Sequence, residues 1–379
     1  MKKTNRNGTI DCLRFLFCVL IVLRHAMHAI PDGCYEPMPG GGLGVEFFFI
    51  VSGYLMTKSA AKRLSNGAPT DLGPDTTAFM KRKLNGMLPE IVISGALCLG
   101  VIALTLIPSG PAAVFSHLFN RIWNPLLLSG AGFGSANEMW YLSVMMIVML
   151  AFYPLLLKRF QVFVRIVSPL IAIFTIGYLY KGLGSLRDPT YFAGIVYKGM
   201  IRGAGEIALG AAMYPVISAF QKLSLTGFAK TLVSVCNLLC WAGTVAIIAV
   251  KHAAVLDIVA LLLIAIGTVL SFSHQGRFAD AFDSRFSGVL GALSLTLYLS
   301  HYWVAMSVKN IYNRLAPSGT FGLGADLKYD YFVVMAVYLT ASAVACTFTW
   351  FVAKYYRTHE KQIKARLRRR LIAAPATEE

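Results

Sequence analysis

Long apolar stretches recur along the whole chain and are separated by short polar segments. A helix needs roughly 20 predominantly apolar residues to cross the hydrocarbon core of a bilayer. The segment 112–128 is shorter and is a candidate eleventh helix that lies in or dips into the membrane. The pattern predicts an all-α polytopic bundle with about ten transmembrane helices, at residues 10–30, 43–61, 87–107, 138–157, 162–180, 194–220, 228–250, 254–272, 286–308 and 330–353.

The composition excludes an ordinary soluble domain. Of the 379 residues, 56% are hydrophobic and only 14% are charged, and the mean hydropathy is +0.62. Soluble domains carry about 25% charged residues. We therefore expect one transmembrane domain over residues 1–353, followed by a basic tail at 354–379, with no separate soluble domain.

Lysine and arginine are unevenly divided between the two sides that these helices define. With the N-terminus in the cytoplasm, the inner loops and span ends hold 24 of the 35 Lys and Arg residues, and the outer ones hold 7. Positively charged loops stay on the cytoplasmic side, so both termini are predicted to be cytoplasmic. The N-terminus resembles the start of a signal peptide, but its apolar run is long and carries Arg14 and His25. We interpret it as a retained first helix.

The net charge of +17 follows from the same asymmetry. The segment 354–370 is strongly basic and is expected to lie along anionic lipid headgroups. No nucleic-acid-binding module accompanies the charge, so we expect no nucleic-acid partner. The seven cysteines are scattered, without a His/Cys cluster at metal-ligand spacing, so the sequence predicts no metal site.

The first predicted helix carries ionisable residues where burial is unfavourable. Arg14 and His25 are eleven residues apart, so they face the same way with about 16 Å between them along the helix. Such a stripe must face protein or a water-filled cavity. A cationic mouth and a deeper imidazole suit a ligand with an anionic head and a long arm, the shape of a coenzyme A thioester. Alternatively, Arg14 reaches the membrane surface and His25 is a structural histidine.

Two stretches are more specific. Residues 11–25 (DCLRFLFCVLIVLRH) and 42–56 (GLGVEFFFIVSGYLM) resemble the opening of the acyltransferase-3 family of integral membrane acyltransferases. The family has Arg and His eleven apart in its first helix and a G-V-[DE]-x-F-F-x-x-S-G-[FY]-like run in its second. Weaker resemblances to a basic stretch before a proline, a W-[FY]-L helix and a Y-L-x-H element follow in the family's order, at residues 79–91, 138–156 and 293–304.

The resemblance implies an inner-membrane enzyme that takes an acyl group, most often acetyl, from cytoplasmic acyl-CoA. The acceptor would be a hydroxyl of a cell-surface or lipid-linked saccharide. One position departs from the family pattern, because Gly86 stands three residues before Pro89, where the family usually has Arg. Basic contacts to the donor would then come from neighbouring cations of that stretch.

These implied roles assign candidate residues. His25 would be the general base for the acceptor hydroxyl, or would itself accept the acyl group. Arg14, helped by Arg82 and Lys83, would bind the phosphates of the acyl-CoA, because guanidinium and ammonium groups recognise phosphate.

The remaining candidates have structural alternatives. Glu46 would orient His25 or pair with an arginine. Ser52 would donate a hydrogen bond to the substrate, unless Ser52 and Gly53 serve only helix packing. His301 would contribute to the active cavity, or would form only a structural hydrogen bond.

Three further polar residues lie within predicted spans. Arg202 and Glu206 are four residues apart, which predicts an ion pair within one helix, whereas Asp257 has no partner recognisable from the sequence.

A different class of function also fits the polar stripe of the first helix, because a proton-coupled transporter or flippase for an anionic or glycan substrate would use it as a pathway. A third reading is a non-catalytic partner in polysaccharide assembly. A homo-oligomer is compatible with each.

Overall fold

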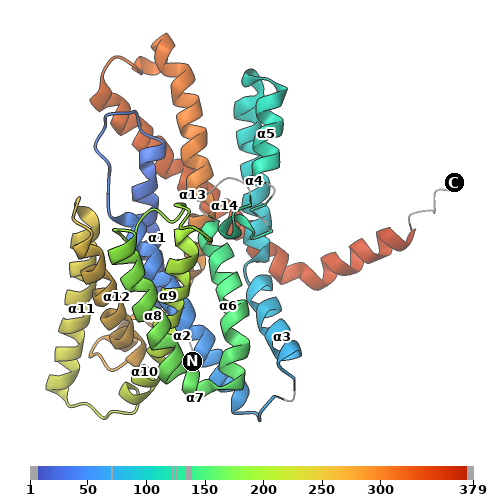
Figure 1. Ribbon diagram of the computed structural model, residues 1–379. Coiled ribbons are helices and arrows are strands. Elements are labelled where there is room, and N and C mark those ends of the chain that lie inside the picture. Colours follow the sequence, from blue (N-terminus) through green and yellow to red (C-terminus); the bar gives the residue numbers. More distant parts are fainter. Residues whose placement is uncertain (1–6, 70, 122, 125, 134–138, 374–379) are drawn as a thin grey trace.

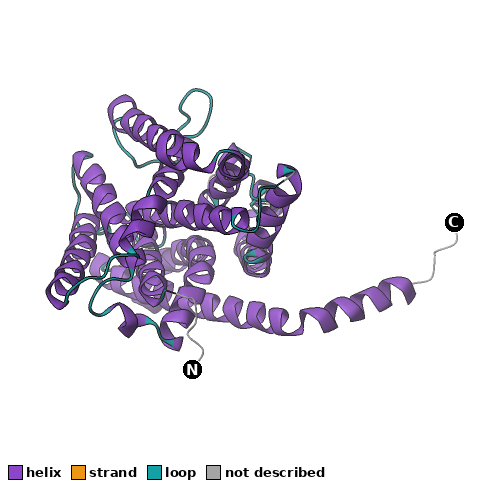
Figure 2. Ribbon diagram, turned by 90° about the horizontal axis from the view of Figure 1, so that it is seen from below, coloured by secondary structure: helices purple, strands orange, loops and turns teal. Residues whose placement is uncertain are grey.

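The computed structural model describes residues 7–69, 71–121, 123–124, 126–133 and 139–373. These residues form a bundle of helices without extended strands (Figures 1 and 2). The longer helices are α1 (Gly8–His25), α2 (Gly44–Leu64), α3 (Leu72–Asn85), α4 (Leu88–Leu106), α5 (Pro111–Arg121), α6 (Trp140–Lys158), α8 (Ser168–Gly177), α9 (Lys198–Ala212), α10 (Tyr214–Phe220), α11 (Gly227–Ala249), α12 (Val255–Ser273), α13 (Arg285–Leu315) and α14 (Leu327–Ala373).

Shorter elements complete the chain. The turn α7 (Phe160–Val162) leads through the wide turn η5 (Phe163–Val167) into α8, which η6 (Tyr178–Gly182) extends. Single tight turns join the other helices: η1 (Ala26–His28), η2 (Gly41–Leu43), η3 (Ile107–Ser109), η4 (Ser129–Ala131), η7 (Ala279–Phe282), η8 (Ala316–Ser318) and η9 (Thr320–Gly322).

Each of the ten predicted spans corresponds to helix in the structure. In the described part of the chain, eight helical segments are long and apolar enough to cross a membrane. They run over Leu88–Ser109, Trp140–Lys158, Phe160–Gly182, Lys198–Phe220, Gly227–Ala249, Val255–Ser273, Arg285–Ser318 and Leu327–Glu360. The remaining two expected spans are α1 and α2, which carry proportionally more charged residues and lie inside the bundle among the others (Figure 1). The prediction of a polytopic helical membrane protein is confirmed.

Some expected features differ in extent or fall outside the description. The candidate eleventh helix is α5, whose 11 residues span about 16 Å, too short to cross a bilayer. The predicted boundary at residue 353 is not a break in the helix, because α14 continues through it to Ala373. Residues 122, 125, 138 and 374–379, which belong to predicted spans or to the tail, lie outside the described residues.

The outer surface of the bundle is apolar, as a bilayer requires. Large hydrophobic side chains are exposed on the peripheral helices, where a soluble protein would carry charge, including Leu104, Phe174, Leu238 and Phe348. Polar and charged groups are instead buried inside, among them Asp11, Glu46 and Arg202. This inverted distribution follows from a hydrocarbon solvent, in which unpaired polar groups are strongly unfavourable.

Glycines allow the central helices to approach closely. α2 packs along α9, and a Cβ added at Gly53 of α2 would lie 2.0 Å from the carbonyl oxygen of Ile207 on α9. A Cβ at Gly210 of α9 would lie equally close to the carbonyl oxygen of Ile50 on α2. Only glycine permits such backbone contact between membrane helices. The structure thus confirms the packing role expected for Gly53.

Two ends of the bundle are distinguished by the chain segments found there. The start of α1, the junction of α3 with α4 and residue Arg357 of α14 lie at one end, which we call the tail side. At the same end, α14 leaves the bundle toward the C-terminus (Figure 1). The end of α1 and the starts of α2, α6 and α9 lie at the other end, the opposite side. The charged residues of α1 are therefore distributed between two ends of one helix.

Candidate functional site

A cavity of about 430 Å³ opens on the opposite side of the bundle. The end of α1 contributes His25 and His28 to it, α6 contributes Trp140, and α13 contributes Tyr302. α1 packs along α13, so the end of one helix and the middle of the other meet at this cavity. The cavity thus has two histidines and three aromatic rings in its wall, the third ring being that of Tyr298.

The hydrogen bonding of His25 determines which ring nitrogen is available. Its Nδ1 lies 2.8 Å from the carbonyl oxygen of Ile21, one turn earlier in α1. Because a carbonyl oxygen only accepts hydrogen bonds, the neutral ring carries its proton on Nδ1. The lone pair is then on Nε2. His25 thus lines the cavity as a proton acceptor, the form that a general base requires.

His301 lies directly beside His25. The two ring centroids are 4.9 Å apart with an edge-to-face arrangement. His301 is fully buried, and its Nδ1 lies 2.7 Å from the carbonyl oxygen of Tyr298. Within the described residues its Nε2 has no hydrogen-bond partner. The structure therefore brings the two predicted histidines into contact, although only His25 lines the cavity.

Glu46 contacts an arginine and not His25. A guanidinium nitrogen of Arg202 lies 3.3 Å from Glu46, and Nε of Arg202 lies 2.9 Å from Glu206. All three side chains are buried. The predicted ion pair between Arg202 and Glu206 is present, and Glu46 completes a triad across α2 and α9. Of the two roles expected for Glu46, the structure places it in the arginine pair.

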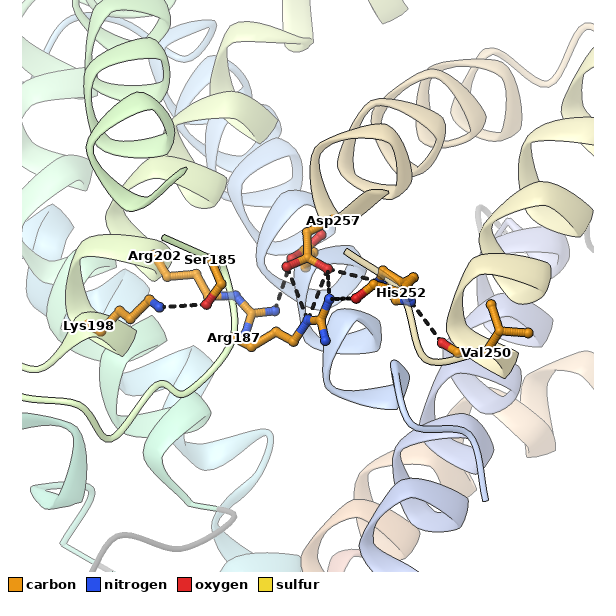
Figure 3. A network of polar contacts seen from close by, with 8 residues as sticks. Ser185, Arg187, Lys198, Arg202, Val250, His252 and Asp257 are labelled. Carbon is orange, nitrogen blue, oxygen red and sulfur yellow. Dashed lines mark hydrogen bonds and ion pairs between the residues drawn. The ribbon is translucent and has the colours of Figure 1, made fainter. Parts of the chain in front are cut away.

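A second polar network borders the same cavity (Figure 3). Nε of Arg187 lies 3.1 Å from both carboxylate oxygens of Asp257, and Nε2 of His252 lies 2.9 Å from one of them. Arg187 also donates to the carbonyl oxygen of His252 at 2.9 Å. Arg187 lines the cavity, whereas Asp257 is fully buried. Sequence reasoning missed these partners of Asp257 because they come from loops 70 and 5 residues away.

A second cavity, of about 460 Å³, opens on the tail side. Four cations from three helices line it: Arg14 from α1, Arg82 and Lys83 from α3, and Arg357 from α14. Burial, together with the positive charge of Arg14, lowers the pKa of the Lys83 ammonium to about 8. The three residues predicted to bind the donor thus line one cavity.

Arg357 is a residue that sequence reasoning missed. It donates to the carbonyl oxygen of Gly86 at 2.7 Å and forms a bidentate pair with Glu90, whose second oxygen lies 2.6 Å away. A guanidinium from α14 therefore contacts Gly86, the position at which the family usually has arginine. The only sequence signal was its position at the start of the basic tail, where we had expected contacts with lipid headgroups.

Ser52 belongs to the tail-side cavity and not to the cavity of His25. Its Oγ lies 3.4 Å from the hydroxyl of Tyr141 and 3.3 Å from Sδ of Met145. Both Ser52 and Tyr141 line the tail-side cavity. These two hydroxyl groups therefore line the tail-side cavity, and the predicted residues Ser52 and His25 belong to different cavities.

The described residues also contain one group with the ligand types of a metal site. The side chains of His274, Asp280 and Asp283 have ligand atoms within 4.8 Å of one another. Nε2 of His274 already pairs with Asp280 at 3.0 Å, and Asp283 accepts a hydrogen bond from the Gly8 backbone at 2.7 Å. This group lines neither cavity. It stabilises the start of α1.

Comparison with known families covers almost the whole chain. A family model described as an acyltransferase domain, of the acyltransferase-3 type, matches residues 7–356. The match includes every residue that lines the two cavities except Arg357, which is one residue beyond its end. Comparisons with curated proteins and with solved structures give no match.

Proposed function

The chain belongs to the acyltransferase-3 family, and on this premise we propose that it transfers an acyl group, most simply acetyl, from acyl-CoA to a hydroxyl of a cell-surface or lipid-linked glycan. One observation carries the proposal. A cavity with several cations and a cavity with a proton-accepting histidine lie at opposite ends of α1 and share Tyr298 in their walls. Such a pair can hold an anionic donor on one side and a hydroxyl on the other.

The charges of the tail-side cavity support an anionic donor. In the described part of the chain, neither Arg82 nor Lys83 has a carboxylate partner within ion-pair distance. Unpaired cations at a cavity favour phosphate groups, which acyl-CoA carries at one end of a long narrow arm. With the phosphates near these cations, the arm would extend along α1 toward His25.

The charges of the opposite-side cavity support an uncharged acceptor. Arg24 pairs with Glu36 at 3.2 Å, Arg187 pairs with Asp257 at 2.9 Å, and Arg202 lies between two carboxylates. These cations are already compensated, so little net attraction remains for an anion. Trp140 and Tyr302 instead line this cavity with aromatic side chains, against which sugar rings can pack.

The transfer step uses groups that line the two cavities. Nε2 of His25 takes the proton of the acceptor hydroxyl, and the hydroxyl oxygen attacks the thioester carbonyl carbon. The carbon–sulfur bond then breaks, and the thiolate of CoA receives the proton from the imidazolium. The hydroxyls of Ser52 and Tyr141, on the donor side, would stabilise the developing oxyanion. In the covalent alternative, His25 first carries the acyl group and then passes it to the hydroxyl.

The same scheme assigns sides to the membrane. Acyl-CoA is a cytoplasmic metabolite, and the positive loops also lie on the tail side, so we propose that the tail side faces the cytoplasm of a bacterial-type inner membrane. The acceptor would then enter from the outer side. Membership of an acyltransferase family favours transfer over the transport alternative.

The test measures release of CoA thiol from acetyl-CoA by the purified full-length protein in detergent, with a mixed glycan extract as acceptor. We expect release by the wild type and loss of release in His25→Ala. His274→Ala is the matched control, because that histidine lines neither cavity. Equal release by wild type and His25→Ala would overturn the role of His25. Folded wild-type protein that binds no acyl-CoA would overturn the assignment of acyl-CoA as the donor and favour the transport alternative.

A further inference from the structure

Tyr298 occupies a special position between the two cavities. It lines the opposite-side cavity and also lines the tail-side cavity, and no other described residue borders both. Trp140 and Tyr141, adjacent in α6, are divided between them, since Trp140 faces the former and Tyr141 the latter. The boundary between the two cavities therefore passes through α13 at Tyr298 and through the start of α6.

The ring of Tyr298 is held in this boundary by its neighbours. It packs edge-on against Tyr141, with centroids 5.7 Å apart, and lies 5.6 Å from the ring of His301. Its own carbonyl oxygen accepts the hydrogen bond from His301 at 2.7 Å. Only 6% of Tyr298 is exposed. The ring is thus a packed wall with a cavity on each side, and His25 lies beyond it as seen from Arg14.

We propose that the ring of Tyr298 is the barrier that selects the acyl chain and keeps water of the opposite-side cavity away from the thioester. This inference rests on the proposed function. The carbonyl carbon must meet the acceptor oxygen at the boundary, so the acyl group lies against the ring. A two-carbon chain needs little room there, whereas a longer chain must displace a packed aromatic ring. Each extra methylene then lowers the rate.

The same ring limits a competing reaction. Hydrolysis requires water to attack the thioester carbonyl carbon, which breaks the carbon–sulfur bond and releases a carboxylic acid and CoA thiol. Water has access to His25 through the opposite-side cavity, and the ring separates that water from the donor until an acceptor hydroxyl is in place. Removal of the ring joins the two cavities. Acyl selection and suppression of hydrolysis should therefore be lost together.

The first experiment compares acetyl-, butyryl- and hexanoyl-CoA as donors, with and without acceptor. In Tyr298→Ala we expect the kcat/KM ratio of acetyl- to hexanoyl-CoA to fall at least about tenfold, since pocket selectivity per methylene is of this order. Hydrolysis without acceptor should rise in the same variant. Tyr298→Leu, which keeps more of the volume, should show a smaller change in the same direction. Tyr298→Phe, which keeps the ring, should match the wild type.

Phe48→Ala is the matched control. Phe48 lines the tail-side cavity alone, so its removal enlarges that cavity without joining the two. We expect no rise in hydrolysis for this variant. If Tyr298→Ala and Tyr298→Leu both transfer acetyl with unchanged selectivity and unchanged hydrolysis, the barrier is disproved while the proposed function stands. If Phe48→Ala reproduces their behaviour, cavity volume and not the barrier is responsible.

A second experiment tests the barrier without turnover. The seven native cysteines are replaced, and Ser52→Cys then introduces a single thiol in the wall of the tail-side cavity. A small membrane-impermeant methanethiosulfonate reagent is applied to vesicles from the opposite side. We expect modification only when Tyr298→Ala or Tyr298→Leu is also present. Modification with Tyr298 intact would overturn the barrier, and wild-type protein that transfers no acyl group from any donor would overturn only the proposed function.

Discussion

The two cavities differ in how their positive charges are compensated. On the opposite side, Arg187 and Arg202 are held by carboxylates within 3.3 Å. On the tail side, Arg82 and Lys83 have no such partner among the described residues, and the half-buried Lys83 has a lowered pKa. Compensated cations stabilise the fold and position other groups, whereas uncompensated cations favour binding of an anion. Cations in this bundle thus have two roles, a structural role where carboxylates pair with them and a proposed ligand-binding role where no carboxylate does.

This difference predicts that variants in the two cavities change different kinetic constants. His25→Ala should lower kcat by about 10²- to 10⁴-fold, the usual contribution of a general base, with unchanged binding of acyl-CoA. Arg14→Ala should mainly weaken that binding. Steady-state kinetics with equilibrium binding of acyl-CoA measures both. A loss of acyl-CoA binding in His25→Ala would contradict separate roles of the two cavities in catalysis and donor binding.

The buried triad provides the sharpest structural prediction. Arg202→Met should destabilise the protein by about 3–5 kcal/mol, because it leaves the carboxylates of Glu46 and Glu206 buried without their cation. Unfolding in detergent, followed by circular dichroism, measures the change. Arg202→Lys keeps the positive charge and should lower the free energy of unfolding by less. An unchanged midpoint for Arg202→Met would show that the carboxylates do not depend on this arginine.

The tail-side cavity should be sensitive to pH. Because the pKa of Lys83 is about 8, its ammonium is charged at pH 7 and loses its proton as the pH rises toward 9. We expect kcat/KM for acyl-CoA to fall severalfold over this range, since this constant reports the free enzyme. Lys83→Arg keeps its charge throughout and should remove the component of the fall that centres near pH 8. A component near pH 8 that persists in this variant would assign the titration elsewhere.

The Arg187 network should have the smallest effect. His252→Ala removes one of the partners of Asp257 but leaves its bidentate contact with Arg187. We expect a severalfold rise in KM for the acceptor, of the order of one lost hydrogen bond at about 1 kcal/mol, with KM for acyl-CoA unchanged. Kinetics at varied acceptor concentration provide the readout. An equal rise in both constants would place the network between the cavities instead of at one of them.

The positions of the membrane helices follow from the sequence because they depend on local hydrophobicity. An apolar run of about 20 residues is long enough to cross the bilayer wherever it occurs. The ten helices therefore begin within a few residues of their predicted starts, although α13 and α14 extend beyond their predicted ends. The spacing of Arg14 and His25 on one face also follows from helical periodicity alone. Arg14, Arg82 and Lys83, to which the family resemblance assigns donor binding, line one cavity.

Only the tertiary structure decided which residues meet across helices. Periodicity gives the direction of a side chain on its own helix but not the neighbour that it faces. The choice of Arg202 as the partner of Glu46, the reach of Arg357 to Gly86, and the pairing of Asp257 with Arg187 all depend on helix packing. The division of the polar stripe into two cavities has the same origin. The wall between them comes from α13 and α6, far from α1 in sequence.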